Sequence, residues 1–168
     1  MPMSPSTAAP PVILPPGAVP VDPFPALAGT RSFVSGDPGG SRLRLAYYRL
    51  PGDATLHARV WFGQGAQGPP GHAHGGSMAA VLDEAAGGAA WLAGHRILIA
   101  RLTTDFRRMV PLGTDATVHA WVESIDGRKV ITRARLVDEA GEPFAEAEAL
   151  CVLLGDERLN ALIEQAGP

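Results

Sequence analysis

The chain has 168 residues, 46% hydrophobic and 18% charged, a composition typical of one folded domain with a sizeable core. A formal net charge of −3 argues against a general electrostatic affinity for nucleic acid. The single cysteine, Cys151, excludes an internal disulfide, so nothing indicates an oxidising compartment and we expect a cytoplasmic protein.

Residues 1–30 are predicted to form an N-terminal arm. Nine of the sixteen prolines lie in this segment, and Asp22 is its only charged residue. Such a composition favours an extended or disordered chain over a folded unit. The apolar piece at 12–14 lies between prolines and has no basic start, so we predict neither a signal peptide nor a membrane span. Docking of the arm on the domain through Phe24 and Leu27 is the alternative.

Two segments of alternating polarity follow the arm and predict a β-hairpin. Residues 42–49 alternate apolar and polar side chains, and residues 55–62 place four apolar side chains on one face. The Pro-Gly-Asp sequence at 51–53 is a turn sequence between them.

Residues 68–94 are predicted to be a turn that leads into one long helix. Apolar side chains recur at the spacing of three and four that defines one helix face, at Met78, Val81, Leu82, Ala85, Ala89 and Leu92. Gly94 is well placed to end the helix. Most of its other residues are Ala and Gly, which predicts close packing on all sides.

Four further segments with two-residue periodicity predict strands. The residues expected to share a face are Leu98, Ala100, Leu102, Thr104 and Phe106, then Ala116, Val118, Ala120 and Val122, then Val130, Thr132, Ala134 and Leu136, and finally Ala145, Ala147, Ala149, Cys151 and Leu153. The tail at 156–168 is expected to include a short helix. This order predicts an α+β domain at 31–155, in which one helix packs against an antiparallel sheet. One helix cannot cover both faces of the sheet. We therefore expect a second copy of the chain to cover the other face or the sheet edges, which implies at least a homodimer.

Polar groups at two positions of the predicted helix indicate chemistry. Asp83 interrupts a run of small apolar residues, where a buried carboxylate is costly without a partner or a task. The alternative is an exposed helix acid like its neighbour Glu84. At the helix start, Gly75 and Gly76 after His74 place backbone N–H groups where a developing oxyanion would be stabilised. The alternative there is a glycine turn that only admits the chain into the helix.

The sequence Gly-Pro-Pro-Gly-His-Ala-His-Gly-Gly-Ser-Met-Ala-Ala-Val-Leu-Asp at 68–83, with the segments 105–113, 127–129 and 145–148, resembles the hotdog-fold acyl-CoA thioesterases of the PaaI-like and thioesterase-superfamily-member type. The resemblance covers about residues 33–154. It implies a hotdog fold, in which a curved antiparallel sheet wraps a central helix. It also implies homodimers, often paired into homotetramers, and a hydrolase that cleaves the thioester at the dimer interface.

The resemblance also implies roles for individual residues. Asp83 would be the general base or nucleophile, the Gly75 N–H would polarise the thioester carbonyl, and His74 would position or stabilise the leaving side, with Gly76 beside it. No metal or cofactor is needed, and coenzyme A enters only as part of the substrate. His72-Ala-His74 has no clear third ligand, so we do not predict a metal site.

Two departures from the family pattern leave the substrate contacts open. Some relatives have an Asn or Gln in the loop before the His, and the candidates in this chain are Gln64 and Gln67. Some have a Ser or Thr near the position of Ile99, and this apolar residue leaves Thr103 or Thr104 as the substitute that would hold the water.

The spacing of Gly75 and Asp83 independently favours a site shared between two chains. Eight residues of helix rise about 12 Å, which is too far for both groups to reach one thioester carbon. A two-fold partner would bring Asp83 of one chain to Gly75 of the other, giving two sites per dimer. Desolvation by the apolar helix wall would raise the pKa of the carboxyl and make it a better base near neutral pH.

The phosphates of coenzyme A would need cations, for which Arg107, Arg108, Arg128 and Lys129 are the candidates. The alternative for each is a solvated sheet edge. Two other functions stay open: a non-catalytic acyl-CoA binding or sensing module, which would have no use for a buried Asp83, and a hotdog hydratase or dehydratase. Small residues beside the helix leave the acyl group undetermined.

Overall fold

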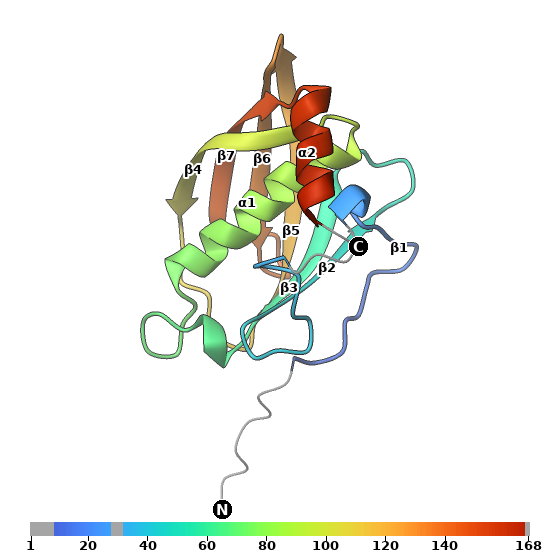
Figure 1. Cartoon of the computed structure of the whole chain (residues 1–168). Coiled ribbons are helices and arrows are strands. Elements are labelled where there is room, and N and C mark those ends of the chain that lie inside the picture. The colour runs from blue at the N-terminus through green and yellow to red at the C-terminus, as the bar shows by residue number, and fades with distance from the viewer. Residues whose placement is uncertain (1–8, 28–31, 167–168) are drawn as a thin grey trace, which may run out of the picture.

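A computed structural model describes residues 9–27 and 32–166 of the chain. In this part, a seven-stranded antiparallel sheet has the order β1-β2-β3-β5-β6-β7-β4, and the long helix α1 packs against one of its faces (Figure 1). The elements are β1 (Val19–Pro20), the 3-10 helix η1 (Pro25–Leu27), β2 (Leu43–Arg49), β3 (Leu56–Phe62), the 3-10 helix η2 (Gln64–Ala66), α1 (Gly75–Leu92), β4 (Ile97–Phe106), β5 (Asp115–Asp126), β6 (Lys129–Val137), β7 (Pro143–Leu153) and α2 (Asp156–Ala166). The predicted α+β hotdog architecture is confirmed.

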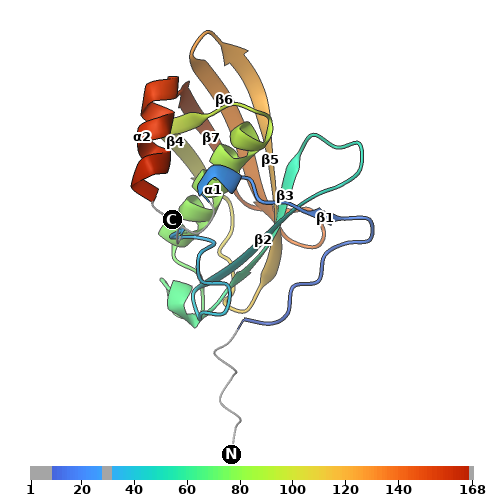
Figure 2. The ribbon, with the colours of Figure 1, turned by 45° about the vertical axis from the view of Figure 1, so that its right-hand side comes forward.

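Small side chains bring α1 close to the sheet that curves around it (Figure 2). A Cβ added at Gly88 would lie 3.0 Å from Leu56 on β3 and 3.1 Å from Pro23 in the arm. Glycine at this position therefore permits contact with both elements, at an intrinsic cost to the helix of about 1 kcal/mol relative to Ala. The helix stops before Gly94, whose φ of +90° lies in the left-handed region that favours glycine.

One strand departs from the predicted alternation. The pairing of β4 with β7 shifts by one residue between Ile99 and Arg101, which is a β-bulge. Leu98 therefore points away from the core and is 52% exposed, whereas Ile99 and Leu102 pair with buried inner-face residues of β7. The expectation that Leu98 and Ala100 share a face with Leu102 was wrong, because the bulge reverses the alternation.

The described part of the N-terminal arm is extended and lies against the domain. Pro20 pairs with Tyr48 of β2, and the Phe24 ring meets the Trp91 ring edge-on at 5.6 Å between centroids. Phe24 and Leu27 are half-buried against the core, as in the docked alternative. Residues 1–8 and 28–31 of the predicted arm lie outside the described residues.

The C-terminal helix α2 forms where the short tail helix was predicted, and its Leu159 packs against the core. Across the residues that the structure describes, we find no helix with the length and apolarity needed to cross a bilayer.

Candidate active site

The N-terminus of α1 leaves one backbone donor open. The Nδ1 atom of His74 accepts a hydrogen bond from the Gly76 N–H at 2.8 Å and caps the helix. Gly75 N–H is one of the donors that a helix leaves without an internal partner, and no described residue accepts from it. A Cβ on Gly75 would lie 3.4 Å from the Phe106 ring. This donor therefore lies beside the end of β4, at the positive end of the helix dipole.

The loop before the helix fixes the capping histidine. The His74 N–H donates to the Ala66 carbonyl at 2.7 Å, and a Cβ on Gly68 would lie only 2.7 Å from His74 Cα. Because Nδ1 accepts a hydrogen bond, a neutral His74 ring carries its proton on Nε2. The ring is exposed at the helix start.

Asp83 lies two turns further along α1 and opens into a cavity of about 880 Å³. Its side chain is exposed in the single chain, as in the alternative that the sequence left open, and not buried. Partial desolvation, followed by the negative charge of Glu84, still raises the pKa of Asp83. None of the described residues donates a hydrogen bond to Asp83 or forms an ion pair with it. The carboxylate is therefore free to act on a ligand in the cavity.

Glu84 is the polar residue of this region that sequence reasoning missed. It accepts hydrogen bonds from the Tyr47 hydroxyl at 3.1 Å and from the Ser32 hydroxyl, so grouping it with exposed acids was wrong. Burial and then the charge of Glu84 raise the pKa of Tyr47 well above its usual value, which keeps the phenol protonated as a donor. Tyr47 is buried on β2, where a hydroxyl needs a hydrogen-bond partner.

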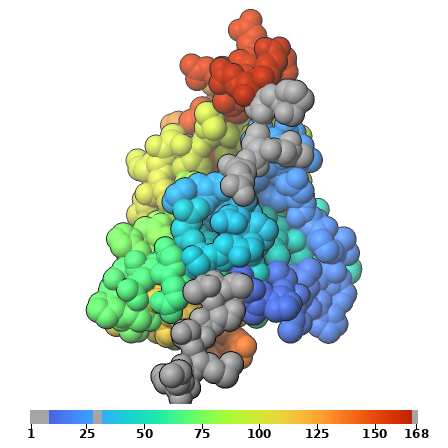
Figure 3. Space-filling model, turned by 60° about the horizontal axis from the view of Figure 1, so that its bottom comes forward, coloured from blue at the N-terminus to red at the C-terminus, as the bar shows by residue number. Residues whose placement is uncertain are grey.

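Three elements and the arm enclose the cavity beside Asp83. Its walls are α1, β4, the arm and the turn at 32–36, and its lining includes Phe24, Leu27, Val34, Gly87, Trp91, Ile99 and Leu102. Figure 3 shows the arm (blue) and the segment that follows it (cyan) together on one face of the molecule. The cavity volume is within the range of small-molecule sites.

The residues predicted to hold the water and to contact the substrate from the loop lie in different places in the structure. Thr103 pairs with Glu148 and lies on the outer face of the sheet, away from the Asp83 cavity of the same chain. The neighbouring Thr104 pairs with the buried Ala147 and faces inward, because the bulge in β4 sets the alternation. The Gln67 side chain accepts the Gly71 N–H at 3.3 Å and shapes the loop before the helix, whereas Gln64 is exposed in η2.

The four candidate phosphate ligands do not form one patch. Backbone N–H groups of Arg107 and Arg108 bond to the Phe144 carbonyl, while Arg128 bonds to Leu153 at the other end of β7. Nine strand residues separate these points by about 30 Å. Lys129 adjoins Arg128, so the two pairs lie at opposite ends of β7 within one chain.

The pair beside the α1 N-terminus also has partners of its own. The Arg107 guanidinium lies 3.2 Å from Glu146, and Arg108 lies 2.8 Å from Asp138 with its guanidinium over the Phe144 ring. Within the part of the chain that the structure describes, no group of three metal-binding side chains occurs, and His72 Nδ1 lies 2.9 Å from the Pro70 carbonyl oxygen.

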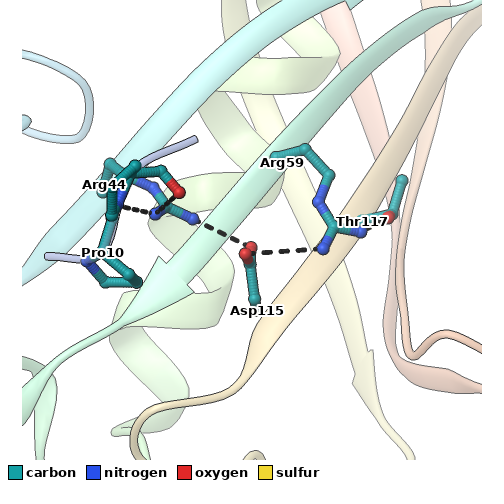
Figure 4. A network of polar contacts seen from close by, with 6 residues as sticks. Pro10, Arg44, Arg59, Asp115 and Thr117 are labelled. Atoms are coloured by element: carbon teal, nitrogen blue, oxygen red, sulfur yellow. Dashed lines mark hydrogen bonds and ion pairs between the residues drawn. The ribbon is translucent and has the colours of Figure 1, made fainter. Parts of the chain in front are cut away.

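Charged residues on the outer face of the sheet are paired with one another. Asp115 on β5 lies 3.0 Å from the Arg44 guanidinium and 3.4 Å from that of Arg59, which also donates to Thr117 (Figure 4). Arg44 donates as well to the carbonyls of Pro10 and Pro11 in the arm. These charges therefore hold the arm and the strands together, on the face opposite Asp83.

Comparison with known proteins gives matches over the same region. The model of the thioesterase superfamily matches residues 70–145. The acyl-coenzyme A thioesterase THEM4 of Xenopus laevis is 41% identical over 71 residues, 42% of this chain and 32% of that protein. The THEM4 of Bos taurus is 34% identical over 94 residues, 55% of this chain and 38% of that protein. The matches thus span about a third of the length of these curated relatives.

Solved structures show the same fold. A thioesterase superfamily protein of known crystal structure has a TM-score of 0.69 at 29% identity, covering 84% of this chain and 68% of that one. The E. coli PaaI protein from the phenylacetic acid degradation operon has a TM-score of 0.59 at 16% identity, covering 67% and 80%. The arrangement of α1 and the sheet is therefore shared with these proteins.

Proposed function

We propose, on the premise that residues 70–145 belong to the thioesterase superfamily, that this chain hydrolyses an acyl- or aryl-CoA thioester to the free acid and coenzyme A. The observation that supports this most strongly is a pair of groups on α1 that have no partner among residues 9–27 and 32–166. One is the Gly75 N–H at the positive end of the helix, and the other is the Asp83 carboxylate, whose pKa is raised. An acyl transfer to water needs a donor for the oxyanion and a base or nucleophile.

In the proposed reaction, the thioester oxygen accepts the Gly75 N–H as the carbonyl carbon becomes tetrahedral. Asp83 either takes a proton from the attacking water or attacks the carbon itself, with water then cleaving the anhydride. The C–S bond breaks, its electron pair goes to sulfur, and the proton taken from water returns to the thiolate. The role proposed for His74 is to stabilise the leaving sulfur through its Nε2 atom. This chemistry calls for neither a metal nor a cofactor.

We propose that each site is shared between two chains. Gly75 and Asp83 lie eight residues apart in α1, about 12 Å along the axis. β4 is an edge strand of the described sheet, ten residues long, and Leu98 and Phe106 on it are about half exposed. Pairing of β4 with its two-fold mate would cover this edge and bring Gly75 of one chain toward Asp83 of the other. Two such dimers would give the tetramer expected from the resemblance.

We further propose a cytoplasmic location, with which the free, buried Cys151 thiol is compatible. Cell fractionation with a tagged full-length chain tests this, and recovery in an oxidising compartment would contradict it.

Thiol release from a panel of acyl- and aryl-CoA substrates, followed with a thiol reagent, tests the activity itself. We expect release with the wild type and at least one member of the panel. Binding of the same compounds without thiol release would support the non-catalytic binding module instead.

Mixing two inactive variants tests the shared site. Asp83→Ala removes the carboxylate, and Gly75→Pro removes the backbone N–H. Proline is tolerated at this position because it lies in the first helical turn and because the ψ of 136° at His74 suits a residue before proline. With random exchange about half of the dimers are mixed, and each has one intact site of two, so activity should recover to roughly a quarter of wild type. No recovery despite demonstrated exchange would contradict the shared site.

A further inference from the structure

The cavity beside Asp83 has walls that the thioesterase reaction alone does not explain. Its lining is mainly apolar, and its polar residues are Asp22 in the arm, Ser32 and Ser35 in the turn that follows, and Asp83 and Glu84 on α1. The described arm, far from α1 in the sequence, contributes Asp22, Phe24 and Leu27 to this lining. We propose that arm residues 22–27 form a wall of the acyl-binding pocket, so that the arm limits the length of an uncharged, apolar acyl group. This inference rests on the proposed hydrolysis of a thioester at Asp83.

Several independent contacts fix the arm over α1. The Asp22 carboxylate accepts the Phe24 N–H at 2.8 Å, and the Phe24 carbonyl accepts the Leu27 N–H at 2.9 Å, which together shape the turn. The Phe24 ring meets Trp91 of α1 edge-on. Pro23 is buried where Gly88 leaves no side chain. The arm is therefore a fixed wall in this part of the chain.

A second wall, the turn at 32–36, is attached to the helix through Glu84. The Ser32 hydroxyl donates to Glu84 and also accepts the N–H groups of Val34 and Ser35, at 3.2 and 3.3 Å. This arrangement holds the turn at 32–36 next to Asp83. A group that enters between the two walls thus has the proposed base at one side and the arm at another.

The third side of the cavity is open enough to take an acyl chain. Ile99 and Leu102 of β4 face α1 across it, and Gly87 contributes no side chain. A Cβ on Gly87 would meet only Ile99 Cδ1, at 3.8 Å, which is an ordinary contact. A Cβ can therefore be added at Gly87 without a clash, and a longer side chain there would extend toward Ile99.

The lining sets the chemistry of the occupant. Apolar side chains favour a hydrocarbon or an aromatic ring, and each buried methylene tightens binding about four-fold. An ionised carboxylate at the far end of the acyl group would lose its hydration in this environment. We therefore expect hexanoyl-CoA to be preferred over adipoyl-CoA, which has the same chain length and ends in a carboxylate.

The experiment compares chain-length profiles of the wild type and matched variants of the full chain. Phe24→Ala removes the arm's ring from the wall, Gly87→Leu fills the open side, and Ile13→Ala is the control, since Ile13 lies in the same arm, is 78% exposed and does not line this cavity. Two readouts are recorded for straight-chain acyl groups of increasing length: thiol release from acyl-CoAs, and dissociation constants of S-alkyl-CoA thioethers, which cannot be hydrolysed.

We expect Phe24→Ala to shift both optima toward longer chains, Gly87→Leu toward shorter ones, and Ile13→Ala to leave both unchanged. Melting temperatures establish that each variant is folded. If Phe24→Ala does not fold, Gly87→Leu still tests whether the cavity binds the acyl group, and Leu27→Ala tests whether the arm limits its length. Unchanged optima in the folded variants, or equal use of hexanoyl- and adipoyl-CoA, would overturn the inference. Absence of thiol release by the wild type on the whole panel would instead contradict the proposed function, and the thioether profiles would still test the pocket.

Discussion

The helix side and the outer face of the sheet use their charged residues differently. On the outer face, Asp115 lies between two arginines, and Glu148 lies 2.7 Å from Arg133. On the helix side, Asp83 has no partner among the described residues, and the Gly75 N–H is likewise open. A carboxylate that neighbouring cations already neutralise contributes to holding strands together, whereas one left without a partner is available to a ligand. The difference locates the candidate chemistry on the helix side, although the outer face has more charges.

The sharpest test of this comparison removes a carboxylate charge from each side. Asp83→Asn should lower kcat by at least about 100-fold, because a positioned base or nucleophile is lost. The matched change Glu148→Gln on the outer face should leave kcat within about two-fold, since its charge serves only Arg133. Steady-state thiol release with both purified variants provides the measurement, and an Asp83→Asn protein with near-normal turnover would exclude Asp83 from the chemistry.

The backbone donor should matter almost as much. Gly75→Pro removes one hydrogen bond to the oxyanion and should reduce kcat about 100-fold, whereas Gly75→Ala retains the N–H. The Ala Cβ would meet the Phe106 ring at an ordinary 3.4 Å, so this control tests the cost of a side chain at the same place. Equal activity of the two variants would show that the N–H has no role in catalysis.

Glu84 should influence catalysis only by raising the pKa of Asp83, without contacting the substrate itself. Its negative charge helps to raise the pKa of Asp83, so Glu84→Gln should lower that pKa and extend the active, ionised form of Asp83 to lower pH. The acid limb of the kcat/KM profile should therefore shift to lower pH. Tyr47→Phe, which removes a hydrogen bond to Glu84 but keeps its charge, should not lower the limb. A limb that moves equally in both variants would point to a purely structural role.

The smallest effect is expected on the outer face. Arg133 is about half exposed and lies 3.6 Å from Glu123 as well as close to Glu148. Arg133→Ala should therefore reduce the free energy of unfolding by no more than about 1 kcal/mol, because solvent screens such pairs. Chemical denaturation measures this difference, and a drop of several kcal/mol would mean that the outer network is a main source of stability.

The sequence by itself determined the elements and the inner faces of most strands. Residues 116, 118 and 120 of β5 and residues 130, 132, 134 and 136 of β6 are buried as their period-2 pattern predicts, and α1 runs from Gly75 to Leu92 as its apolar spacing predicts. Both signals depend only on the repeat of the backbone, so they can be read locally. The motif at 68–83 also indicated which helix to examine, and its resemblance to hotdog thioesterases agrees with the matched family model.

Only the tertiary structure decided which side chains meet. The β4 bulge, which turns Thr103 outward and Thr104 inward, depends on pairing with a strand more than forty residues away, and period-2 reasoning has no signal for it. The separation of Arg107 and Arg108 from Arg128 and Lys129 follows from the length and direction of β7, which no motif states. The contacts of Glu84 with Ser32 and Tyr47, and of Phe24 with Trp91, join segments that are distant in the chain. Local sequence determines whether a segment forms a helix or a strand, because each has its own repeat of buried side chains. Long-range packing determines which segments become neighbours, and those neighbours determine which polar groups are left without a hydrogen-bond partner and available to a ligand.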